Sequence, residues 1–99
     1  MNPVSDFPWK YKHVAADTLV ASGHGCLHSI VINGLTTVGD ATIYDNTAEL
    51  GTIIGVLHLN TATSVSVQPI TLLYDIEFNT GLYIGFDATL VADLTVSYK

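Results

Sequence analysis

Residues 70–78 read ITLLYDIEF, and their alternation decides the fold class. Every second side chain is apolar: Ile70, Leu72, Tyr74, Ile76 and Phe78. The positions between them hold Thr71, Leu73, Asp75 and Glu77. A period of two with the charges on one side predicts a β-strand with one face on a core and the other in water. The closing stretch LTVSYK repeats the pattern, with Leu94, Val96 and Tyr98 predicted to point inward.

The rest of the chain is also typical of β-structure, because Ile, Val, Thr and Tyr dominate and no window shows a helical period. We expect strands near residues 12–21, 25–33, 40–45, 51–59, 64–67, 70–78, 81–86 and 91–98. Turn-forming residues separate these runs, at Asn33-Gly34, Asp45-Asn46 and Asn79-Thr80-Gly81. Short strands at this spacing predict an all-β fold, an antiparallel β-sandwich of seven to eight strands that is jelly-roll-like.

The stretch GTIIGVLHL, residues 51–59, is apolar on both predicted faces. Strict alternation places Ile53, Leu57 and Leu59 on one face, and Ile54 and Val56 on the other. Such a strand either lies centrally in a sheet or has its outer face covered by another molecule. We therefore expect Ile54 and Val56 to belong to an interface.

Residues 1–11 differ from the single sandwich domain that we expect over residues 12–99. Pro3 and Pro8 favour an extended arm, since proline disfavours helix and ladder pairing. Three aromatic residues of this arm need a place to be buried, either on their own domain or on a neighbouring subunit. These are Phe7, Trp9 and Tyr11, which we also predict to be interface residues.

Composition excludes several classes of function. The 99 residues are 48% hydrophobic and 12% charged, which indicates one folded domain. The chain has three lysines, no arginine and nine acidic residues, and its net charge of −6 disfavours binding to nucleic acid or an anionic membrane. Apolar runs are far shorter than the roughly 18 residues of a membrane span. The N-terminus lacks the pattern of a secretion signal, so we expect synthesis in a cytoplasm.

The stretch SGHGCLHSIVING, residues 22–34, raises the question of a metal site. His24, Cys26 and His28 could supply up to three zinc ligands, with Asp40, Asp45 or His58 as a fourth. Paired spacings typical of zinc sites are missing. We favour a turn followed by a strand, in which Cys26, His28, Ile30 and Ile32 share one face. Cys26 would then be a buried thiol acting as a small apolar residue.

The sequence gives little support to a cysteine nucleophile, a glycosidase site or a calcium site. Cys26 and a histidine two residues away point the same way on a strand, without converging on a shared proton. Asp75 and Glu77 lie about 7 Å apart, within reach of glycosidase geometry, but on a solvated face. Oxygen ligands in YDNTAELG, residues 44–51, could hold calcium, yet a polar turn explains them equally. We expect neither enzymatic activity nor a cofactor.

Several segments together resemble a known class of proteins. They are SG-x-G-x-LH-x-IVIN, TIYDNTA-x-x-GT-x-I, YDIEFNTGL and the closing DLTVSYK, which extend over roughly residues 10–99. This pattern resembles the small β-sandwich virion structural proteins of tailed bacteriophages, which include capsid decoration and cement proteins. The resemblance implies a sandwich in which His28 and Gly81 are scaffold residues, and it supplies no catalytic residue.

The resemblance implies a non-enzymatic virion protein that decorates or cements capsid or neck subunits, in the form of a homo-oligomer, with a trimer expected. Its partner would be the major capsid protein or another virion protein. Deleting residues 1–11 is predicted to leave a folded domain that no longer associates with particles. The alternative is a module that binds glycans on the host surface, for which Tyr44 beside Asp45 and Asn46, or Tyr83, could serve.

Overall fold

A computed structural model describes residues 9–59 and 70–99 of the chain. Phe7 and the predicted strand 64–67 lie outside the described residues. The described part forms eight strands: β1 (Lys10–Val14), β2 (Thr18–Ser22), β3 (Gly25–Thr37), β4 (Gly39–Asp45), β5 (Thr52–Leu59), β6 (Ile70–Phe78), β7 (Gly81–Phe86) and β8 (Val91–Tyr98). No helix in these residues is long and apolar enough to cross a membrane.

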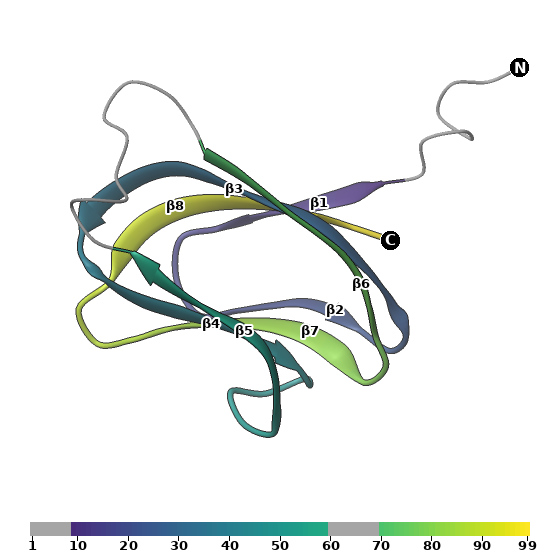
Figure 1. The fold of residues 1–99 in the computed structure, drawn as a ribbon. Helices are drawn as coiled ribbons and strands as arrows, with labels where there is room; N and C mark the ends of the chain where they lie inside the picture. Colours follow the sequence, from purple (N-terminus) through teal and green to yellow (C-terminus); the bar gives the residue numbers. More distant parts are fainter. Residues whose placement is uncertain (1–8, 60–69) are drawn as a thin grey trace, which may run out of the picture.

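The strands form two four-stranded antiparallel sheets that pack as a sandwich (Figure 1). Sheet A has the order β1-β8-β3-β6, and sheet B has the order β2-β7-β4-β5. The pairs β4–β5, β3–β6, β2–β7 and β1–β8 are those of one long hairpin rolled up on itself. This is the jelly-roll order, so the predicted fold class is confirmed.

Inward-pointing side chains of both sheets form one apolar core. Leu94 and Val96 of β8 are fully buried, and Tyr98 packs against the core, as the alternation of LTVSYK predicted. Phe78 at the end of β6 is the largest fully buried side chain. The other fully buried apolar residues are Val14, Leu27, Ile30, Ala41, Ile43, Leu82 and Ile84.

Two predicted boundaries were wrong. The strand predicted over residues 12–21 is two strands in different sheets, because the chain turns at residues 15–17. The turn predicted at Asn33-Gly34 lies within β3, where the ladder to β8 shifts register. The Asn33 amide donates to Asp93 and Thr95 of β8, so it serves the sheet instead of a turn. The chain reverses after Thr37.

Bulges change which residues share a face. In the ladder between β3 and β8, Leu27 is opposite Tyr98 but Ser29 is opposite Ser97, so β3 carries one extra residue. Leu27, Ile30 and Ile32 are therefore buried together, while Cys26 and His28 are partly exposed. The predictions that Cys26 is a buried thiol and that it shares a face with Ile30 and Ile32 were wrong.

β6 carries its own bulge, at Asp75, which has a φ of 49°. Asp adopts this left-handed conformation more readily than most residues. Ile70, Leu72 and Tyr74 pack against the core and Phe78 is buried, as the alternation predicted, whereas Ile76 next to the bulge is 37% exposed.

A bulge in β5 exchanges the predicted faces of Ile53 and Ile54. Gly55 pairs with Ile43 and Ile53 with Tyr44, which leaves Ile54 as the extra residue. Ile54 and Leu57 pack against the core, whereas Ile53 and Val56 are exposed. The predicted grouping of Ile53 with Leu57 and Leu59 was therefore wrong. The strand is nevertheless apolar on both faces.

Candidate functional site

The four edge strands differ in how their free edges are protected. β1 carries Lys10 and Lys12, which are both exposed. Lys12 is opposite the buried Val96, so it lies on the inward-facing side of the strand. Charged residues of this kind on an edge strand oppose pairing with another sheet. This edge is therefore protected against edge-to-edge association.

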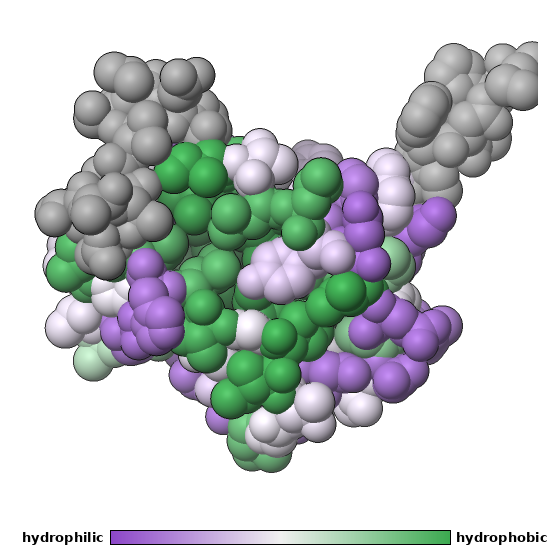
Figure 2. All heavy atoms as spheres, viewed as in Figure 1, coloured by the Kyte–Doolittle hydropathy of each residue, from purple (hydrophilic) through white to green (hydrophobic). Residues whose placement is uncertain are grey.

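The edges formed by β5 and β6 lack this protection. β5 contains no lysine, arginine or carboxylate, and β6 carries only Asp75 and Glu77 near its end. Apolar side chains gather over these two strands and the space between them (Figure 2). We use the name open edge for these two strand edges, whose exposed or half-buried apolar side chains include Ile54, Val56, Leu73, Tyr74 and Ile76.

Exposure of the open edge is high for side chains of this kind. Leu73 is 68% exposed and Val56 is 39% exposed. Tyr74 reaches across from β6 to β5, since a Cβ placed on Gly55 would lie 3.1 Å from the Tyr74 hydroxyl. Burial raises the pKa of Tyr74. Tyr74 of β6 thus lies against Gly55, which stands between the predicted interface residues Ile54 and Val56.

The two aromatic residues of the predicted arm that the structure describes have different environments. The Trp9 ring stacks on His28 with 4.1 Å between ring centroids and 16° between planes. The Lys99 ammonium lies 4.6 Å from the centre of the Trp9 ring. Tyr11 is part of β1 and is 75% exposed. Trp9 therefore packs on its own domain, and Tyr11 remains accessible.

Each histidine contacts a different carboxylate. The pairs are His13–Asp93 at 2.8 Å, His24–Glu77 at 2.6 Å, His28–Asp75 at 2.5 Å and His58–Asp40 at 3.0 Å. His13 holds the pKa of Asp93 below its ordinary value, with help from Asn33. Among residues 9–59 and 70–99, no group of three or more His, Cys, Asp or Glu side chains could hold a metal ion.

In the possible calcium loop, Asp45 and Asn46 form hydrogen bonds that hold turns. Asp45 accepts hydrogen bonds from the N–H groups of Asn79, Thr80 and Gly81, which lower its pKa. The Asn46 amide donates to Leu50 O at 2.7 Å. Glu49 lies away from both, against Gly85 of β7. These oxygens do not converge on one point.

The outer face of sheet B brings together the two tyrosines named for a glycan site. Tyr44 and Tyr83 are directly opposite on β4 and β7, with their rings 6.3 Å apart in an edge-to-face arrangement. Leu19 and Ile53 extend this row to the outer strands. Burial raises the pKa of Tyr83, as do the nearby carboxylates of Asp17 and Glu49.

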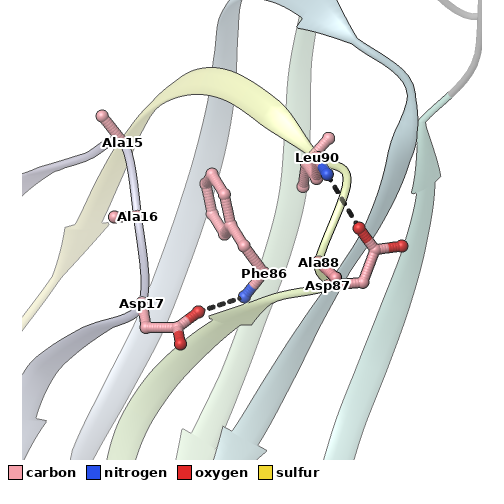
Figure 3. Close-up of a pocket in the computed structure, with 7 residues that line it drawn as sticks. All are labelled: Ala15, Ala16, Asp17, Phe86, Asp87, Ala88 and Leu90. Atoms are coloured by element: carbon pink, nitrogen blue, oxygen red, sulfur yellow. Dashed lines mark hydrogen bonds between the residues drawn. The ribbon is translucent and has the colours of Figure 1, made fainter.

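A shallow depression of about 410 Å³ lies between the turn at residues 15–17 and the segment 86–90 (Figure 3). Its carboxylates belong to Asp17 and Asp87. Asp17 accepts from the Phe86 N–H at 2.7 Å, and Asp87 accepts from the Leu90 N–H at 2.8 Å. Both carboxylates therefore hold the backbone in place.

Comparisons with known proteins find no match: no family, no curated protein and no solved structure is significantly similar to this chain. The two-sheet sandwich and the geometry of its surfaces are therefore the basis for a functional proposal.

Proposed function

We propose that this protein is a non-enzymatic structural subunit of a tailed-phage virion, which attaches to capsid or neck subunits through protein–protein contacts. The likeness of its sequence segments to small virion sandwich proteins supports the setting. The open edge supports the mode of action. It is the observation that carries the proposal.

The reasoning starts from β5. A strand that is apolar on both faces needs either a central place in a sheet or a covering molecule. Among the described strands, β5 is at the edge of sheet B and not at its centre. Its outer residue Val56 is exposed in the isolated chain, as are Leu73 and Ile76 of β6, and Figure 2 shows apolar surface over both strands. Contiguous exposed apolar surface of this kind marks interaction sites in soluble proteins.

A decoration subunit gains from such a surface because the same modest contact is repeated around a symmetric particle. The outer edges of β5 and β6, which pair with no other described strand, also offer backbone N–H and C=O groups to a partner's extended segment. Aromatic and aliphatic anchors at the centre of an interface carry most of the binding free energy. Tyr74 is at that position between β5 and β6.

The test measures co-sedimentation of purified protein with phage particles that lack it. Val56→Ser and Leu73→Ser each remove exposed apolar area from the open edge, and each should weaken association about tenfold. Val91→Ser is the matched control, since Val91 is 50% exposed but lies on β8, which is not an edge strand. Association of Val56→Ser and Leu73→Ser equal to the wild type would contradict the proposal.

A further inference from the structure

Two carboxylates on the outer face of sheet B have no cationic partner. Glu49 lies over Gly85, where a Cβ would come within 2.7 Å of its Oε1. Asp17 lies beside the next residue, accepting from the Phe86 N–H. Neither forms a salt bridge within the part of the chain that the structure describes. We call Asp17, Tyr44, Glu49 and Tyr83 the acidic tyrosine face.

The cations of the chain lie elsewhere. Its three lysines are Lys10 and Lys12 on β1, and Lys99 at the chain end, all associated with sheet A. Lys99 contacts Trp9. Lys10 and Lys12 are exposed and form no salt bridge with any described residue. Lys10 and Lys12 lie on one side of β1 and the exposed Tyr11 on the other, and we call these three residues of the strand the lysine edge.

We propose that the lysine edge of one copy docks on the acidic tyrosine face of a second copy. The two surfaces are complementary in charge, with two ammonium groups and two carboxylates that form no salt bridge among the described residues. Tyr44 and Tyr83 add ring faces on which an ammonium group is stabilised. Leu19 and Ile53, which are 43% and 53% exposed, flank the rings and offer apolar contact to Tyr11.

A second copy would pair the negative charges of the acidic tyrosine face, which a neutral sugar cannot do. Sugar hydroxyls would hydrogen-bond to Asp17 and Glu49 but leave both negative charges unpaired. Complementary charge at a contact also steers association and rejects wrong partners. Because the two surfaces differ, the contact is head-to-tail, and repetition of it closes a ring when the rotation between copies permits. A ring agrees with the homo-oligomer predicted from the resemblance.

The test is the mass of the purified full chain by size-exclusion chromatography with light scattering, in a dilution series. The wild type is expected at a multiple of 10.6 kDa, and at lower mass when ionic strength rises from about 0.05 M to about 0.5 M. Lys12→Glu and Glu49→Lys should each weaken association at least tenfold. The double variant Lys12→Glu/Glu49→Lys should regain the wild-type mass.

Glu77→Lys is the matched control, because it makes the same charge change as Glu49→Lys on sheet A and should leave the mass unchanged. Circular dichroism of every variant verifies folding. A monomeric wild type at all concentrations overturns the proposal, and so does an oligomer that Glu49→Lys leaves intact. Shifts of the Tyr44 and Tyr83 signals with methyl glucoside but not with protein concentration would assign the face to sugars instead. Particle association is measured separately with open-edge variants, so the two proposals can fail independently.

Discussion

At the scale of single residues, three acidic side chains of the described part, Asp17, Asp45 and Asp87, hold the backbone through hydrogen bonds. Asp45 joins the end of β4 to the turn between β6 and β7, since it accepts from the N–H groups of Asn79 and Thr80 at 3.0 and 2.8 Å. Asp87 does the same between the start of β4 and Leu90. Backbone N–H donors stabilise the ionised carboxylate, so the pKa values of Asp45 and Asp87 are lowered.

Asp45→Asn tests this role. The amide keeps one acceptor oxygen but loses the charge, so we expect a loss of about 1 kcal/mol in the free energy of unfolding at neutral pH. The folded-state pKa of Asp45 is below the ordinary value of 3.8. Its contribution is therefore present above that value and is lost as pH falls through the lower folded-state pKa.

Urea unfolding at pH 7 and at about pH 2 measures both expectations. The difference between wild type and Asp45→Asn should be largest at pH 7 and should shrink once Asp45 is protonated. A difference that stays constant across this range would show that the carboxylate charge is not the source of the stabilisation.

The residue scale also shows what the sequence could not predict. The pairs His28–Asp75 and His24–Glu77 join side chains far apart in the sequence, through the register of β3 and β6. Glu49 of the turn between β4 and β5 lies over Gly85 of β7, because β7 pairs with β4. No local spacing reveals such contacts, because strand pairing and bulge positions decide them. Asp45-Asn46 and Asn79-Thr80 were predictable turns, since their residue types act locally.

At the scale of elements, strand existence was more predictable than strand boundaries or faces. The alternation in β6 and β8 follows from burial on one side, which the sequence records directly. A bulge shifts every later side chain to the other face, and it depends on the partner strand. This is why Ile53 and Ile54 exchanged places and why Cys26 is partly exposed. The sequence likewise did not determine whether β5 is a central strand or an edge strand.

The beginning of β1 gives an element-scale prediction. Trp9 stacks on His28 and contacts Lys99, so it fixes the start of the strand against β3 and the chain end. We expect Trp9→Ala to lower the free energy of unfolding by about 1–2 kcal/mol, because a stacked pair and a cation–π contact are both lost. Thermal unfolding followed by circular dichroism measures it.

Tyr11→Ala is the control for this prediction, since its side chain is 75% exposed and should change stability little. Equal losses for the two variants would mean that β1 is fixed by its ladder to β8 alone. A deletion of residues 1–11 would also remove the first two residues of β1, so ending the deletion at residue 8 separates the arm from the strand.

At the scale of the whole molecule, the rolled-hairpin order sets how the chain must fold. Among the described strands, only β4 and β5 are both consecutive in the sequence and paired in a sheet. The outermost pair joins Lys10 to Tyr98, almost the full length of the chain. Loop closure over such distances costs entropy before the contacts repay it.

We therefore expect refolding from urea in milliseconds to seconds, which is typical of all-β domains dominated by distant pairings. Stopped-flow fluorescence of Trp9, the single tryptophan, reports the process at the β1 end of the molecule. Pairing of β4 with β5 closes the shortest loop among the ladders, so Ile43→Val should slow folding, whereas Val14→Ala in β1 should mainly speed unfolding. Equal effects of both substitutions on the folding rate would show that the β1–β8 pair already forms in the transition state. Refolding of the wild type in microseconds would contradict the dependence of the folding rate on distant pairing.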